Sequence, residues 1–224
     1  MSSTSTPALL LINLGSPDEP TVPAVRRYLD QFLMDERVID LPYLLRALLV
    51  KGIILNTRPK KSAEAYRKVW TDEGSPLIVT SQKLAEEVGE RWGGPVALGM
   101  RYGNPSIASA LDEIGQAGAD EAIVVPLYPH YSMSSYETVV AQVLEELSKM
   151  ADPIRVHFLP PFYDHPLYRK VLAEVTAPHL EGQWDHLLIS FHGVPVRHIE
   201  KRDPSGCYCL KTEDCCFTDH PATP

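Results

Sequence analysis

The alternation of apolar segments with longer amphipathic segments most constrains what this chain can fold into. The predicted strands in the second half are 96–102, 121–128, 154–158 and 186–191, and the helices between them are 106–117, 135–150 and 166–179. Strands separated by helices of about ten or more residues are typical of βαβ units. The pattern therefore predicts an α/β fold, doubly wound around parallel sheets with right-handed crossovers.

The first part of the chain fits the same fold. A continuous apolar run at 8–14 predicts a strand that is buried on both faces. The predicted helices that follow are 22–34, 41–55, 60–70 and 76–92, with a break at Arg58-Pro59. The best boundary lies at Ala151-Asp152-Pro153, which predicts a first domain at 7–150 and the start of a second at 151–224.

Composition excludes several classes of protein. The formal net charge of −8 argues against binding to nucleic acid, because that binding depends on neutralising phosphates with Lys and Arg. No apolar run reaches the roughly 20 residues of a spanning helix, and the N-terminus lacks an export signal. The expected compartment is the cytoplasm, where thiols stay reduced. The four cysteines are therefore expected to be metal ligands or buried thiols.

Ligands of open parallel sheets bind beyond the carboxyl ends of the strands, so the loops at those ends are the candidate site. These loops carry polar or aromatic groups, and they begin at Gly15, Arg101, Tyr128 and Ser190, the last of them including His192. None contains the glycine pattern of a phosphate-binding loop. The sequence therefore predicts no nucleotide cofactor.

Several segments together resemble the ferrochelatase family, and their order and spacing over residues 8 to 204 make the resemblance specific. They are Leu11-Ile12-Asn13-Leu14-Gly15-Ser16-Pro17, Val25-Arg26-Arg27-Tyr28-Leu29, Arg58-Pro59-Lys60-Lys61-Ser62, Gly74-Ser75-Pro76-Leu77, Met100-Arg101-Tyr102-Gly103-Asn104-Pro105, Pro126-Leu127-Tyr128-Pro129-His130-Tyr131-Ser132 and Ser190-Phe191-His192-Gly193-Val194-Pro195. The resemblance implies two Rossmann-like halves around a porphyrin cleft, the second of them incomplete here.

The resemblance also implies an activity, the insertion of ferrous iron into a porphyrin to form haem, which is a lyase reaction. Metalation needs a base for the two pyrrole protons and a ligand for the iron, and a neutral imidazole serves as either near neutral pH. The histidine of the family's Ser-x-His-x-x-Pro motif matches His192. Without the motif, a structural histidine at a strand end would be the ordinary interpretation.

Other family pocket residues match positions in the strand-end loops. Arg101 is expected to hold a propionate through two parallel hydrogen bonds, and Tyr128 to stack on the ring or donate a hydrogen bond to a substrate group. The alternatives are a surface Arg in an ion pair and a half-buried structural Tyr. Further candidates for substrate binding are Asn13, Tyr131, Ser132 and Ser134.

All four cysteines lie within 207–216, in the order C-x-C-x5-C-C. Cys207, Cys209, Cys215 and Cys216 are thiol donors at a spacing that suits an iron–sulfur or a zinc centre. The segment resembles the internal insertion that holds a [2Fe-2S] cluster in some bacterial ferrochelatases. The alternative is a set of free thiols.

The apolar stretch at 41–55 has two interpretations. A helix that is apolar nearly all round is usually buried in a core. The resemblance instead implies a lip of the cleft that touches a membrane, which would make the protein membrane-peripheral.

Three functions remain open. The first is ferrochelatase activity, in a chain that lacks the acidic residue expected opposite the histidine because family members continue for about one further domain. The second is cobalt or nickel insertion into sirohydrochlorin, and the third is a non-catalytic, truncated protein that binds porphyrin or an iron–sulfur cluster. The segments at Arg101-Tyr102 and Tyr128-Pro129 favour the first over the second.

Overall fold

The computed structural model describes residues 6–218 and residue 220, and it forms two compact units. The first unit comprises Met1–Tyr128 and Ser134–Pro160, and the second comprises Pro129–Met133 and Pro161–Pro224. The first unit extends past the boundary expected at residue 150, because the strand that follows this boundary joins the first sheet.

The first unit is built on a parallel sheet of four strands in the order β2-β1-β3-β4, which confirms the predicted fold class. The strands are β1 (Ala8–Asn13), β2 (Val96–Met100), β3 (Glu121–Pro126) and β4 (Arg155–Phe158). β1 is central, and its Leu10 aligns with Ala97 of β2 and Val124 of β3. This central position explains why β1 is apolar up to Asn13 at its carboxyl end.

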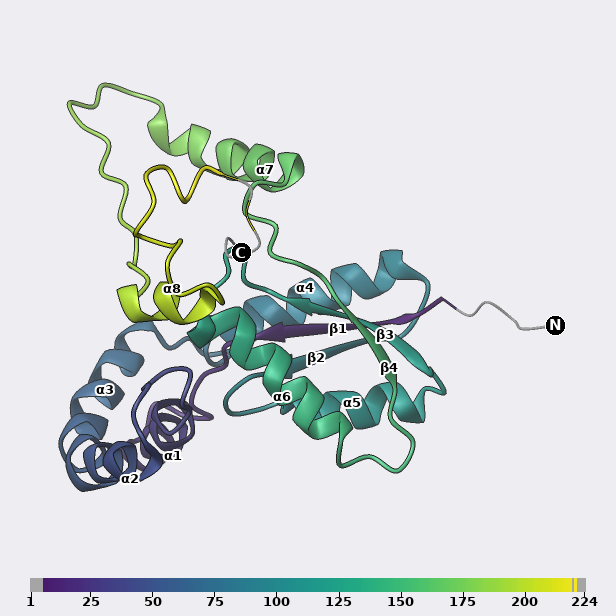
Figure 1. The fold of residues 1–224 in the computed structure, drawn as a ribbon. Coiled ribbons are helices and arrows are strands. Elements are labelled where there is room, and N and C mark those ends of the chain that lie inside the picture. Colours follow the sequence, from purple (N-terminus) through teal and green to yellow (C-terminus); the bar gives the residue numbers. More distant parts are fainter. Residues whose placement is uncertain (1–5, 219, 221–224) are drawn as a thin grey trace. The chain divides into compact units, whose positions relative to one another are not determined.

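Helices cover both faces of this sheet (Figure 1). Helices α5 (Ile107–Gln116) and α6 (Thr138–Leu147) lie on one face, and α4 (Pro76–Trp92) lies on the other. The π-helical turn η2 (Met133–Glu137) leads into α6. The core between the sheet and α5 and α6 is apolar and includes Leu10, Ile12, Val124, Leu111, Ile114, Val139 and Val143.

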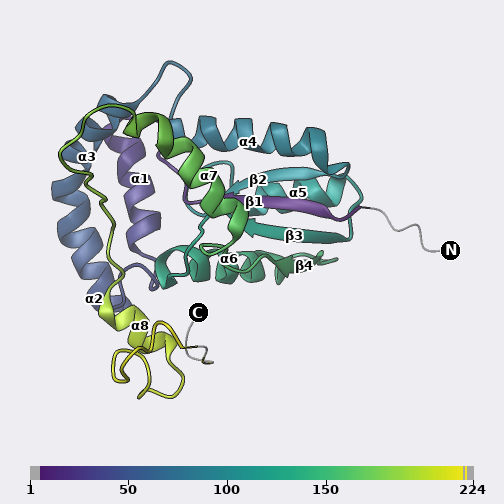
Figure 2. The ribbon, with the colours of Figure 1, turned by 90° about the horizontal axis from the view of Figure 1, so that it is seen from above.

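Helices α1 (Val22–Leu33), α2 (Tyr43–Ala47), η1 (Leu48–Ile54) and α3 (Leu55–Val69) gather beyond the carboxyl end of β1 (Figures 1 and 2). The break expected at Arg58-Pro59 is wrong, because α3 continues through Pro59. Pro59 and Ala63 are buried, and the Tyr66 ring packs edge-on against Tyr28 of α1 at 6.4 Å. This packing against α1 outweighs the one backbone hydrogen bond that a proline removes.

The second unit contains α7 (Pro166–Thr176), the 3-10 turn η3 (Ala177–Leu180) and α8 (Val196–Arg202). The strand expected at 186–191 is wrong, because these residues have no regular secondary structure. A strand requires a hydrogen-bonded neighbour, and the described residues of this unit include no other strand.

Candidate active site

The loops that leave β1 and β2 lie side by side at the carboxyl edge of the sheet. The Arg101 N–H donates to the Asn13 carbonyl at 2.8 Å, and the Tyr102 N–H donates to the Leu14 carbonyl at 2.9 Å. Tyr128 lies two residues beyond β3. Parallel strands bring Asn13, Arg101 and Tyr128 to the same edge, as the sequence predicted.

Two glycines allow these loops to approach each other. Gly15 has φ +100°, and a Cβ placed on it would lie 1.7 Å from the Tyr102 carbonyl oxygen. Gly103 has φ +84°, and its Cβ would lie 2.6 Å from the Ser16 carbonyl oxygen. Both positions therefore require glycine, for its backbone angle and for its lack of a side chain.

Arg101 is held in a buried ion pair. This agrees in part with the alternative interpretation, in which Arg101 forms an ion pair at the surface. Its Nη2 donates to Asp35 Oδ2 at 2.5 Å, and its Nε donates to Thr138 Oγ1 at 2.7 Å and to the Thr138 carbonyl at 3.1 Å. The side chains of Arg101 and Asp35 are 10% and 4% exposed. Unlike a surface pair, this one is shielded from water and salt.

The centre of this network is Asp35, which follows the C-terminal end of α1 and which sequence reasoning missed. Its Oδ2 also accepts hydrogen bonds from the Tyr102 hydroxyl at 2.8 Å and from the Thr138 hydroxyl, and its Oδ1 accepts from the Arg37 N–H at 2.8 Å. Burial would raise the pKa of Asp35, but these hydrogen bonds and the charge of Arg101 hold it below its ordinary value.

Tyr102, for which the sequence predicted no role of its own, completes this cluster. The Arg101 guanidinium carbon lies 4.4 Å from the centroid of its ring, close enough for a cation–π contact. Burial raises the pKa of Tyr102, so its hydroxyl keeps its proton and remains a donor to Asp35. The only sequence signal for this role was its position beside Arg101 at a strand end.

Tyr128 packs against the apolar core of the sheet, and its hydroxyl is buried. This hydroxyl has no hydrogen-bond partner among the described residues. Burial raises the pKa of Tyr128, so the phenol stays neutral and can donate a hydrogen bond.

Asn13 uses its side chain within the protein. Its Nδ2 donates to Ser81 Oγ of α4 at 3.0 Å, and its Oδ1 accepts from the Leu14 N–H at 2.8 Å. Ser134 lies half-buried in η2 of the same unit. The expected contacts of Asn13 and Ser134 with substrate stay predictions.

His192, Tyr131 and Ser132 belong to the second unit. His192 is exposed, in the segment between η3 and α8 that has no regular structure. Tyr131 and Ser132 line a cavity of about 490 Å³, together with α8 and the cysteine segment. The guanidinium carbon of Arg202 lies 5.2 Å from the centroid of the Tyr131 ring. Because His192 and Tyr128 lie in different units, their convergence on one cleft stays a prediction.

The cysteine segment folds against the same cavity. Cys209 and Cys215 are buried, Cys207 and Cys216 are exposed, and the Sγ atoms of Cys215 and Cys216 are 3.9 Å apart. Three of these thiols line the cavity, whereas Cys207 does not. No three metal-binding side chains in the described part of the chain are arranged to hold an ion. The four thiols therefore suit a thiolate-bound metal centre in kind and number, although they are not arranged around a single metal position.

Backbone geometry organises this segment. The Asp203 carboxylate, which follows α8, accepts hydrogen bonds from the N–H groups of Tyr208 and Cys209 at 2.8 and 2.9 Å. The Leu210 N–H donates to Cys215 Sγ at 3.3 Å. Hydrogen bonds of the last kind stabilise negative charge on sulfur in thiolate-bound centres.

The helices at 43–54 present apolar side chains to solvent within the first unit. The exposed side chains are those of Tyr43, Leu44, Leu45, Leu48 and Ile53. Most of the stretch at 41–55 is therefore not the buried core helix of the first interpretation, although Val50 and Leu55 are buried. Among the residues that the structure describes, no helix is long and apolar enough to cross a membrane.

Comparison with known proteins gives a consistent answer. A family model described as ferrochelatase matches residues 6–220. The ferrochelatase of Azotobacter vinelandii is 51% identical over 210 residues, which cover 93% of this chain and 62% of that protein. The ferrochelatases of Opitutus terrae and Ectopseudomonas mendocina are each 50% identical and cover 96% of this chain and 63% of their own length. The chain thus spans less than two thirds of these relatives.

Proposed function

Because this chain belongs to the ferrochelatase family, we propose that the whole protein inserts ferrous iron into a porphyrin and so forms haem. The match of the family model to residues 6–220 carries this proposal. Fe²⁺ replaces two pyrrole protons, so the products are haem and two protons. The relatives described above are named ferrochelatases, which favours iron and porphyrin over cobalt or nickel and sirohydrochlorin.

We assign to His192 the roles of base for the pyrrole protons and of ligand for the incoming iron. A neutral imidazole can accept a pyrrole proton or bind the incoming iron, and the exposed side chain is free of the core. Iron is a substrate in this reaction, so the ligand must hold it only until the ring takes it.

Arg101 and Tyr128 are proposed to bind the porphyrin. A cation at the sheet edge can attract a propionate, and the Tyr128 hydroxyl, which lacks a described partner, can donate to a substrate oxygen or nitrogen. Asn13, Tyr131, Ser132 and Ser134 are proposed as secondary contacts. Tyr131 and Ser132 have the better support, because they line a cavity.

The cysteine segment is proposed to hold a [2Fe-2S] cluster through Cys207, Cys209, Cys215 and Cys216. Such a cluster, when bound, supplies a one-electron centre that ties the segment together. Protein of the relatives' length, purified without oxygen, should be brown and contain equal amounts of iron and acid-labile sulfide. Colourless protein that contains zinc would instead indicate a structural zinc site.

We also propose that the exposed apolar side chains at 43–53 contact a membrane, which carries the apolar porphyrin. Lys51 is exposed in the same stretch and suits an anionic surface, whereas Arg46 is buried and donates to the Leu41 carbonyl. Flotation with anionic vesicles should recover the protein, and the double change Leu44→Glu and Leu48→Glu should abolish recovery. Equal recovery of this variant would contradict the proposal.

The central experiment assays protein of the relatives' length with ferrous iron and either protoporphyrin or coproporphyrin. Haem absorbance should appear with at least one porphyrin. If sirohydrochlorin with cobalt or nickel is turned over instead, the sister activity replaces this proposal. If folded protein binds porphyrin but metalates none, the non-catalytic interpretation replaces it.

A further inference from the structure

We propose that Asp35 is a positioning residue that fixes Arg101 so that a single guanidinium nitrogen, Nη1, is left to bind an acidic group of the substrate. The inference rests on the proposed function, in which Arg101 binds a porphyrin propionate. It replaces the two-nitrogen contact expected from sequence with a contact through one nitrogen.

The guanidinium group of Arg101 already makes hydrogen bonds within the protein. Nη2 is bound to Asp35 and Nε to Thr138, so two of the three nitrogens already have acceptors within the protein. Nη1 donates to no residue that the structure describes. A propionate that approaches Arg101 can therefore accept a hydrogen bond only from Nη1. It cannot form the two parallel hydrogen bonds of a bidentate contact.

Both carboxylate oxygens of Asp35 accept hydrogen bonds within the protein. Its Oδ2 accepts from Arg101, Tyr102 and Thr138, and its Oδ1 accepts from the Arg37 N–H. A carboxylate held from both sides cannot turn away from the arginine. The Thr138 hydroxyl donates to Asp35 and accepts from Arg101, and Tyr102 lies against the guanidinium group. The direction of Nη1 is thus set by three elements, namely the C-terminal end of α1, the loop after β2 and the start of α6.

The functional consequence is selectivity for charge. One charge-assisted hydrogen bond to a propionate favours the free acid over its methyl ester by roughly ten- to a hundredfold in affinity. That preference depends on the direction of Nη1, and it should vanish if Asp35 no longer holds the guanidinium group. Apolar contacts with the ring are the same for acid and ester and should not change.

The test measures binding of protoporphyrin and of its dimethyl ester to protein of the relatives' length by fluorescence quenching. Arg101→Ala should abolish the preference for the acid, and Asp35→Asn should reduce it by about tenfold. The double variant should be no worse than Arg101→Ala alone, because both changes remove the same contact. Thr138→Val is a second probe, since it keeps the shape of Thr138 but removes the hydroxyl that bridges Arg101 and Asp35.

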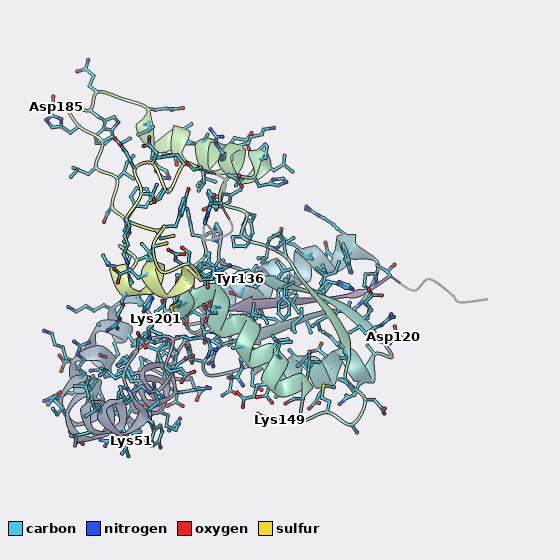
Figure 3. The ribbon with its side chains drawn as sticks, in the orientation of Figure 1. Lys51, Asp120, Tyr136, Lys149, Asp185 and Lys201 are labelled. Carbon is cyan, nitrogen blue, oxygen red and sulfur yellow. The ribbon has the colours of Figure 1, made fainter. Side chains whose placement is uncertain are left out.

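The matched control is Asp120→Asn, which removes an exposed carboxylate paired with Arg155 at 3.5 Å. Figure 3 labels Asp120 at the opposite end of the sheet from Tyr136, which lies two residues before Thr138. This variant should keep the full preference for the acid. Circular dichroism and thermal unfolding identify any variant that fails to fold, and Thr138→Val then decides the question if Asp35→Asn is such a variant.

The outcomes separate the two proposals. If Arg101→Ala keeps the preference for the acid, Arg101 does not bind the propionate. That result contradicts both the proposed function of Arg101 and the role of Asp35. If Arg101→Ala loses the preference while folded Asp35→Asn and Thr138→Val keep it, only the positioning role of Asp35 is overturned. A loss of acid and ester binding alike in Asp35→Asn would show a merely structural role.

Discussion

Asp35 links the buried network around Arg101 to the stability of the first unit. The hydrogen bonds of Thr138 and Arg37 and the charge of Arg101 outweigh the effect of burial, so the pKa of Asp35 lies below its ordinary value of 3.8. A carboxyl whose pKa is lower in the folded than in the unfolded state stabilises the fold above its unfolded pKa. This contribution is lost as the pH falls through the folded pKa.

Asp35→Asn should therefore lower the free energy of unfolding by about 3 kcal/mol near pH 7, because it leaves the buried Arg101 without its counter-ion. The difference between the two proteins should shrink as the pH falls below 3.8 and through the lower pKa of the folded state, where Asp35 of the folded parent becomes protonated. Urea unfolding of both proteins at several pH values measures this. An equal difference at neutral and acid pH would show that charge plays no part.

His192→Ala, in protein of the relatives' length, should reduce iron insertion by about 10²–10⁴ through loss of a general base, and further if the iron ligand is lost as well. Porphyrin binding should persist, because it comes mostly from apolar contact with the ring. Binding by fluorescence quenching and insertion by haem absorbance measure the two effects. His157→Gln, an exposed histidine of β4 paired with Glu121, is the control and should insert iron normally. Near-normal insertion by His192→Ala would mean that another group carries the chemistry.

Sequence reasoning located Arg101 and Tyr128 at the carboxyl edge, because a strand end is a local property that apolar runs reveal. It could not find Asp35, whose partners Arg101 and Thr138 lie 66 and 103 residues further along the chain. In the sequence, Asp35 stands in the polar run Asp35-Glu36-Arg37, which is indistinguishable from a solvated surface. Only the fold brings these side chains together.

At the scale of elements, the contact between the loops after β1 and β2 decides the geometry of the site edge. Gly15 and Gly103 both have positive φ, and each approaches a carbonyl oxygen of the opposite loop. These loops carry Asn13 and Arg101, so the close backbone contact sets the spacing between two candidate ligands. A larger residue must either move the loops apart or strain the backbone.

Gly15→Ala should lower the free energy of unfolding by roughly 3 kcal/mol or more, because the new Cβ meets the Tyr102 carbonyl at 1.7 Å. The control is Gly115→Ala, at an exposed position of α5 where a Cβ meets nothing within 4 Å. This second change should raise stability by about 0.5–1 kcal/mol, because alanine is the better helix former. Chemical unfolding measures both. A mild effect at Gly15 would mean that the loops are free to separate.

The elements that were predicted wrongly from the sequence depend more on tertiary contacts than the others do. β1 was predicted correctly, because five consecutive apolar residues, Ala8 to Ile12, suit a central strand. Pro59 was expected to break a helix, but contacts between α3 and α1 preserve it. Residues 186–191 have the pattern of a strand and lack a neighbouring strand in the described chain. Local pattern thus predicts a preference, and packing decides whether it is realised.

At the scale of the whole molecule, the two units differ in how much apolar surface they bury. The first unit encloses a continuous core between its sheet and two helices. In the second unit, α7 has no buried residue, and Leu188 and Phe191 are 93% and 84% exposed. Since burial of apolar surface is the main source of stability, the second unit should open far more readily than the first.

Limited digestion with chymotrypsin should therefore cut first in the second unit, after Trp184, Phe191 or Phe217, which are exposed and lie outside regular secondary structure. Cuts within the first unit should be at least about tenfold slower, because most of its aromatic residues are packed and the exposed Tyr43 lies in α2, which must open before a protease can cut there. Mass spectrometry of the early fragments identifies the sites. In protein of the relatives' length, cleavage after Phe191 should slow if additional chain supplies a neighbouring strand for 186–191. Early cuts inside β3 or α5 would contradict the ranking of the two units.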